Sequence, residues 1–109
     1  MKTTRYALLL SLSLATAAQA ADETPAELWT AKCKSCHGPD GRAQTQMGKK
    51  EAIVDMSQAA WQKAQTDEDI REVISEGSSR NRKMKPYKEK LTPEQINSLV
   101  GYIRTFKKG

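Results

Sequence analysis

Both cysteines of the chain and its single histidine lie within five consecutive residues, Cys33-Lys34-Ser35-Cys36-His37. Two cysteines three positions apart lie about one turn from each other on a helix. Thiols and an imidazole this close can serve three kinds of chemistry. They can attach a c-type haem through the C-x-x-C-H pattern, exchange a disulfide or contribute to a zinc site.

The full pentapeptide favours haem over the other two. A structural zinc site takes four ligands, and the chain holds only three cysteine or histidine residues. A redox-active disulfide needs no histidine and is typical of a βαβ unit, for which the sequence has no strand pattern. The prediction is one covalently attached haem c, with thioethers to Cys33 and Cys36 and with His37 as the proximal iron ligand. Zinc and disulfide exchange remain the alternatives.

The first twenty residues have the pattern of a secretory signal. Lys2 and Arg5 precede an apolar run over residues 6–14, and Ala18-Gln19-Ala20 forms an A-x-A cleavage site. The apolar run is too short to span a bilayer. We expect cleavage after Ala20, a mature domain over residues 21–109 and no stable membrane insertion. An uncleaved N-terminal anchor is the alternative.

About a third of residues 21–109 are apolar, below the usual 45–50% that includes glycine. A large apolar cofactor would supply the missing core. The formal net charge of +5 would allow nucleic-acid binding, but export argues against that partner. The sequence shows no repeat and no linker, so it predicts one domain.

The apolar spacing predicts an all-α domain of three to five helices. The first helix begins at Pro25, capped by Thr24, and runs into Cys33. A short helix is expected over residues 51–56 and a helical turn over 57–61, capped by Ser57. Thr66 begins the next helix and Gly77 ends it. Residues 78–91 are expected to form a loop with six basic residues: Arg80, Arg82, Lys83, Lys85, Lys88 and Lys90.

The last helix has the clearest pattern. Thr92 and Gln95 form a capping box around Pro93. Apolar residues then follow at helical spacing: Ile96, Leu99, Val100, Ile103 and Phe106. Gly101 is costly inside a helix, so we expect it to mark the close approach of another helix.

These features together resemble the class I monohaem cytochromes c, which are small soluble periplasmic electron carriers. The resemblance covers residues 25–109. It rests on the C-x-x-C-H near the N-terminus, on Trp29 four residues before Cys33, on the segment Met84-Lys85-Pro86-Tyr87 and on the C-terminal helix. It implies that the first and last helices cross, with Trp29 and Tyr102 at the crossing.

The resemblance also implies a methionine as the second iron ligand. Met84 is the candidate, because it precedes the last helix and is followed by Pro86. Met47 is the alternative, and Met56 is expected in the core. A carbonyl in the segment from Met47 to Lys49 is expected to accept the His37 ring N–H.

Two further roles are expected, the first from the resemblance and the second from the charges of the chain. Trp61 is a candidate to donate its indole N–H to a haem propionate, with core packing as the alternative, and Arg80 and Arg82 are further candidates. The basic residues of the 78–91 loop could steer the protein toward acidic docking surfaces of its redox partners, with a merely solvated face as the alternative.

The function expected from these observations is single-electron transfer by a monomeric, periplasmic, non-enzymatic carrier. Two alternatives remain open. The chain could be the haem c subunit of a specific oxidoreductase complex. It could also be a catalytic or sensing haem protein with a labile methionine ligand.

Overall fold

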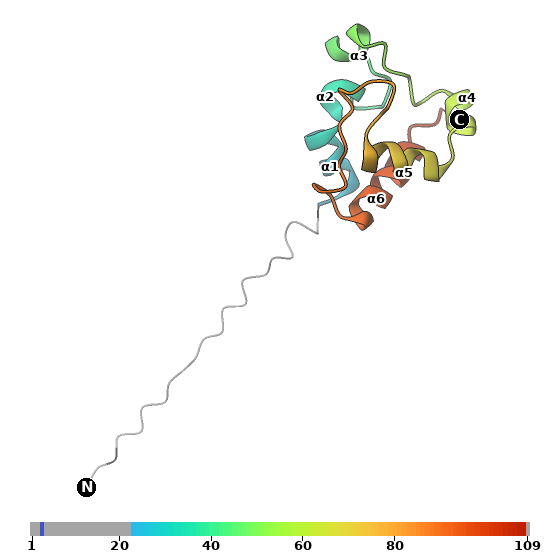
Figure 1. Cartoon of the computed structure of the whole chain (residues 1–109). Coiled ribbons are helices and arrows are strands. Elements are labelled where there is room, and N and C mark those ends of the chain that lie inside the picture. Colours follow the sequence, from blue (N-terminus) through green and yellow to red (C-terminus); the bar gives the residue numbers. More distant parts are fainter. Residues whose placement is uncertain (1–2, 4–22, 109) are drawn as a thin grey trace.

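The computed structural model describes Thr3 and residues 23–108, and the predicted signal segment otherwise lies outside this part. The described residues contain six α-helices and no strand, which confirms the all-α fold (Figure 1). The count exceeds the predicted three to five because Cys33 divides the first helix in two. The helices are α1 (Pro25–Lys32), α2 (Lys34–His37), α3 (Gln46–Lys50), α4 (Ala59–Ala64), α5 (Asp67–Glu76) and α6 (Pro93–Arg104).

Side-chain caps set the starts of the two longest helices among the described residues. At the start of α5, the Thr66 hydroxyl accepts the N–H of Asp69, while the Asp69 carboxylate accepts the N–H of Thr66. The expected capping box of Thr92 and Gln95 is present at the start of α6. Each cap satisfies two N–H groups that the helix itself leaves unpaired. These helix starts are therefore encoded locally.

The core lies where α1 and α5 pack against α6. The Trp29 ring meets the Tyr102 ring at a centroid distance of 5.9 Å and the Phe106 ring at 4.9 Å. The first and last helices therefore cross through aromatic contacts, as predicted (Figure 1). The buried members of this core are Leu28, Trp29, Ile70, Ile74, Leu91, Ile96, Leu99, Val100 and Ile103.

The prediction for Gly101 was wrong. This glycine is exposed, and a Cβ built on it would meet no described atom within 4 Å. The close approach occurs instead at Gly48, where a built Cβ would lie 2.0 Å from the Ala43 carbonyl oxygen. A side chain at Gly48 would therefore push α3 away from the segment that follows His37.

The predicted helix over residues 51–56 is also absent. A helix forms earlier, as α3, because Thr45 caps it: the Thr45 hydroxyl accepts the Gly48 N–H at 2.8 Å. Glu51 is the C-cap residue, and Ala52 follows with a φ of 51°, which ends the helix. The apolar residues after Glu51 suggested a helix, but a cap and a left-handed residue decided its position.

Ser57 does not cap α4, as had been expected. Its side chain is buried and donates to the Asp55 carboxylate at 2.6 Å, while Gln58 is the N-cap residue and makes no side-chain capping bond. The helical turn itself is present and extends to Ala64.

Candidate functional site

The cysteine–histidine pentapeptide folds as one tight turn. Cys33 ends α1 with a φ of −121°, and its carbonyl accepts the N–H groups of Cys36 (3.3 Å) and His37 (3.0 Å). Both cysteines are free thiols and are half-buried. The turn therefore places two sulfurs and one imidazole within five consecutive residues, as C-x-x-C-H chemistry requires.

The Cys33 sulfur lies where a charged form is disfavoured. Burial, with a smaller contribution from Cys36, raises the pKa of the Cys33 thiol to about 11. A thioether sulfur carries no charge, so the same burial does not oppose a covalent bond to an apolar cofactor. The position suits an alkylated sulfur better than a reactive thiolate, which argues against disulfide exchange.

His37 is held in the neutral form that binds metals. Burial lowers the pKa of its imidazole. Its Nδ1 is buried and has no hydrogen-bond partner among the described residues. A neutral imidazole keeps a lone pair with which it can bind a metal. The residues present therefore fit a haem whose iron His37 ligates.

The expected carbonyl acceptor for the His37 ring was wrong. The carbonyl oxygens of Met47, Gly48 and Lys49 accept the backbone N–H groups of Glu51, Ile53 and Ala52 instead. The His37 Nδ1 has no hydrogen-bond partner among the described residues, so none of these carbonyl oxygens accepts its N–H.

Trp29 has a second role that its spacing did not indicate. Its ring is only 2% exposed, and its indole N–H donates to the Gly38 carbonyl at 2.8 Å. The ring also lies 5.8 Å from the His37 ring, centroid to centroid. Trp29 therefore fixes the backbone directly after the histidine as well as filling the core.

The loop between α5 and α6 carries Met84 and is attached to the end of α5. Met84 is half-buried; its N–H donates to the Asn81 carbonyl at 3.1 Å and its carbonyl accepts the Ser78 N–H at 3.1 Å. Farther along, the Tyr87 N–H donates to the Ile74 carbonyl at 2.9 Å. As predicted, the loop contains no helix, and its hydrogen bonds give it a defined path.

Tyr87 brings this loop to the cysteine turn. Its hydroxyl donates to the Lys32 carbonyl at 3.1 Å, at the end of α1, and Figure 1 shows the loop running past α1 and α2. The pKa of the Tyr87 phenol is raised by burial and by the nearby Cys33 and Cys36. The structure thus places the Met84 loop beside the turn that holds both sulfurs.

Three other candidate side chains lie elsewhere. Met56 packs against the core, as expected, while Met47 lies in α3. Trp61 lies on α4 and also packs partly buried against the core. The Trp61 contact to a propionate stays a prediction.

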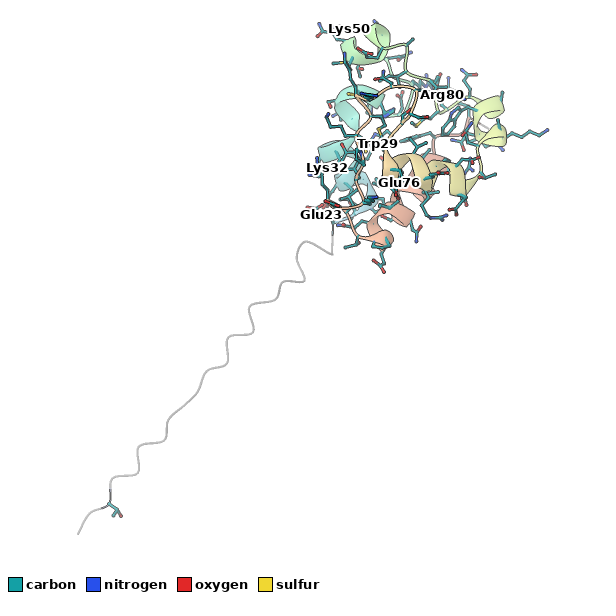
Figure 2. The ribbon with its side chains drawn as sticks, viewed as in Figure 1. Glu23, Trp29, Lys32, Lys50, Glu76 and Arg80 are labelled. Carbon is teal, nitrogen blue, oxygen red and sulfur yellow. The ribbon has the colours of Figure 1, made fainter. Side chains whose placement is uncertain are left out.

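Charged side chains of the 78–91 loop lie in part against acidic partners. Lys88 pairs with Glu76 at 3.0 Å, and Lys83 pairs with Glu51. Hydrogen bonds from Lys83 and Asn81 lower the pKa of Glu51. In Figure 2, Arg80 lies above α5 in the direction of α3. The basic loop is therefore partly neutralised rather than uniformly positive.

Comparison with known proteins agrees with this site. Residues 20–103 match the family model described as cytochrome C oxidase, cbb3-type, subunit III. A solved structure named KustC0563 c-type cytochrome is 41% identical, with 79% of this chain and 100% of that chain covered and a TM-score of 0.72. The structure of a tyrosine-to-phenylalanine mutant of Kustc0563 is 40% identical, with 78% and 100% covered and a TM-score of 0.69. No curated protein matches the chain.

The helix crossing, the pentapeptide and these matches define a small class I c-type cytochrome. The chain belongs to the cytochrome c family described as cbb3-type cytochrome c oxidase subunit III. Membership supports haem-based electron transfer, with haem c as the cofactor and redox proteins as partners. The described residues contain no helix of the length and apolarity that a bilayer crossing demands.

Proposed function

We propose that this protein is a periplasmic single-electron carrier with one covalent haem. Cys33 and Cys36 would hold the haem through thioethers, and His37 and Met84 would be the iron ligands. The observation that carries the proposal is the C-x-x-C-H turn, which brings two half-buried thiols together with a half-buried His37 whose imidazole is kept neutral. The signal over residues 1–20, its cleavage after Ala20 and a monomeric state belong to the same proposal.

The haem, when bound, supplies a one-electron couple between ferric and ferrous iron. The contribution of the chain is to hold two neutral ligands in fixed positions. A thioether from Met84 is soft and favours the ferrous state. If both side chains bound the iron, His37 and Met84 would keep water and peroxide from it, which would suit a carrier rather than an enzyme.

Carbon monoxide binding to the reduced protein tests the Met84 assignment. We expect slow binding in the wild-type protein and fast binding in Met84→Ala. Met47→Ala is the matched control and is expected to behave like wild type. Fast binding in the wild-type protein, together with rapid turnover of peroxide, would favour the catalytic or sensing alternative.

A role as a haem subunit of an oxidase complex is the second candidate, favoured by the description of the matching family. Purification of the tagged protein from its own membranes and periplasm distinguishes the two. A carrier is expected to be recovered alone, whereas a subunit is expected to be recovered in stoichiometric amounts with other chains.

Docking to partners with acidic surfaces is part of the proposal. Arg80, Arg82 and Lys85 are exposed on the loop that carries Met84. Exposed charge of one sign raises association rates at low ionic strength. The rate of reduction by a partner should fall as salt is added, and a rate independent of salt would favour the merely solvated face.

A further inference from the structure

Glu51 connects two segments that are about 30 residues apart in the sequence. It is the C-cap residue of α3, and its side chain is only 18% exposed. One carboxylate oxygen accepts the Lys83 ammonium group, and the other accepts the Asn81 side-chain N–H at 3.0 Å. Both donors belong to the loop that carries Met84, so both oxygens of this carboxylate are used by that loop.

Asn81 organises the turn that presents Met84. Its carbonyl accepts the Met84 N–H at 3.1 Å, and its side-chain oxygen accepts the Lys83 N–H at 3.0 Å. Its own N–H donates to the Ser78 hydroxyl at 3.4 Å. The side-chain amide N–H is left to form a hydrogen bond outside the loop, and it donates to Glu51. The contacts therefore run without a gap from Glu51 through Asn81 to Met84.

We propose that Glu51 is a positioning residue that holds the Asn81 turn, and thereby Met84, in place from across the loop. The inference rests on the proposed ligation of iron by Met84. Glu51 is not proposed as a ligand; it acts by fixing the side chain of Asn81. Without Glu51, Asn81 would lose its contact outside the loop and the turn would open more often.

An ordinary surface ion pair would have little effect, and the Lys83 side chain is 56% exposed. The hydrogen bond from Asn81 to Glu51 should matter more than that ion pair. Its acceptor is a mostly covered carboxylate, and its donor belongs to the turn itself. A hydrogen bond to a charged group changes an opening equilibrium by roughly tenfold to a hundredfold. Since Glu51 keeps some exposure, we expect a change of about tenfold, at the low end of that range.

The test uses the holoprotein and three variants. Glu51→Ala removes both contacts. Glu51→Gln keeps an oxygen that can accept the Asn81 side-chain amide N–H, but it removes the negative charge. Glu76→Ala is the matched control, because it breaks an exposed ion pair with Lys88, on the same loop, and leaves the Asn81 turn intact.

Two rates are measured on the ferrous protein: hydrogen exchange of the Met84 amide and carbon monoxide binding. Amide exchange reports local opening and can be measured whichever side chain ligates the iron. We expect both rates to rise about tenfold in Glu51→Ala and less in Glu51→Gln. In Glu76→Ala we expect both to stay within about twofold of wild type.

The inference is wrong if the Met84 amide exchanges equally fast in Glu51→Ala and Glu76→Ala. It is also wrong if the amide of Leu99, in the core, accelerates as much as that of Met84, because Glu51 would then stabilise only the whole fold. The two proposals fail separately. If Met84→Ala leaves carbon monoxide binding slow, the ligand assignment fails, while amide exchange in Glu51→Ala still decides the role of Glu51.

Discussion

Replacing Gly77 or Gly101 by alanine should change the free energy of unfolding in opposite directions. Gly77 ends α5 with a φ of 81° and a ψ of 174°, a region that only glycine adopts readily. A Cβ there would lie 2.8 Å from the Met84 carbonyl oxygen. Gly101 lies inside α6, and a Cβ there would meet no described atom within 4 Å.

The magnitudes follow from these geometries. For Gly77→Ala, the backbone strain costs about 1–3 kcal/mol. Displacing the Met84 carbonyl costs about 1–3 kcal/mol more. The free energy of unfolding should therefore fall by about 2–6 kcal/mol, a large part of the 5–15 kcal/mol typical of a domain. Gly101→Ala should raise it by about 1 kcal/mol, since alanine is the better helix former.

Guanidinium denaturation of the two oxidised holoproteins measures the difference. Gly77→Ala should also accelerate carbon monoxide binding in the ferrous state, because the clash falls on the residue that carries the proposed ligand. A loss below about 1 kcal/mol for Gly77→Ala would show that the loop after α5 lies elsewhere. A loss for Gly101→Ala would mean that another chain approaches α6 there.

Three further outcomes are expected. Trp29→Phe should lower the free energy of unfolding by about 1–3 kcal/mol, measured by denaturation, because the Gly38 carbonyl loses its buried donor; an unchanged value would contradict that hydrogen bond. Thr92→Ala should cost about 1 kcal/mol by the same measurement, and no loss would show that the cap of α6 is not needed. The Thr66 N–H lowers the pKa of Asp69 below its usual 3.8, so Asp69 stabilises the fold above that pH and loses the effect as the pH falls through its lowered pKa. Asp69→Asn should therefore lower stability at pH 6 and make it less sensitive to pH in that acid range, and parallel pH profiles for the two proteins would refute the assignment.

Features encoded by neighbouring residues were predictable from the sequence. The pentapeptide fixes its own turn, and the Thr92–Gln95 box sets the start of α6. The end of α5 at Gly77 likewise follows from one residue type at one position. In each case the interacting groups are at most four residues apart, so spacing alone identifies them.

Contacts between distant residues could not be predicted from local spacing, and the crossing of Trp29 and Tyr102 was expected only from the family resemblance. Glu51 looks like one more charge in a polar segment until Asn81 is placed beside it, 30 residues later. The Tyr87 hydroxyl reaches the Lys32 carbonyl across 55 residues. Gly101 was expected to contact another helix, whereas Gly48 makes the close approach, because residue type reveals backbone freedom but not the neighbour that uses it.

The position of α3 shows how local signals can compete. The apolar residues after Glu51 favoured a helix over 51–56, but the Thr45 cap begins one at Gln46. Residues 47–49 therefore lie in or next to α3, and among the described residues the His37 Nδ1 has no hydrogen-bond partner.

The absorption spectra of the purified mature protein, oxidised and reduced, test the central claim most directly. We expect a low-spin c-type haem that stays with the chain on denaturation, and a ferric charge-transfer band in the far red from a sulfur bonded to iron. A colourless folded protein from a host able to attach haem would contradict the claim, as would a high-spin ferric spectrum without that band.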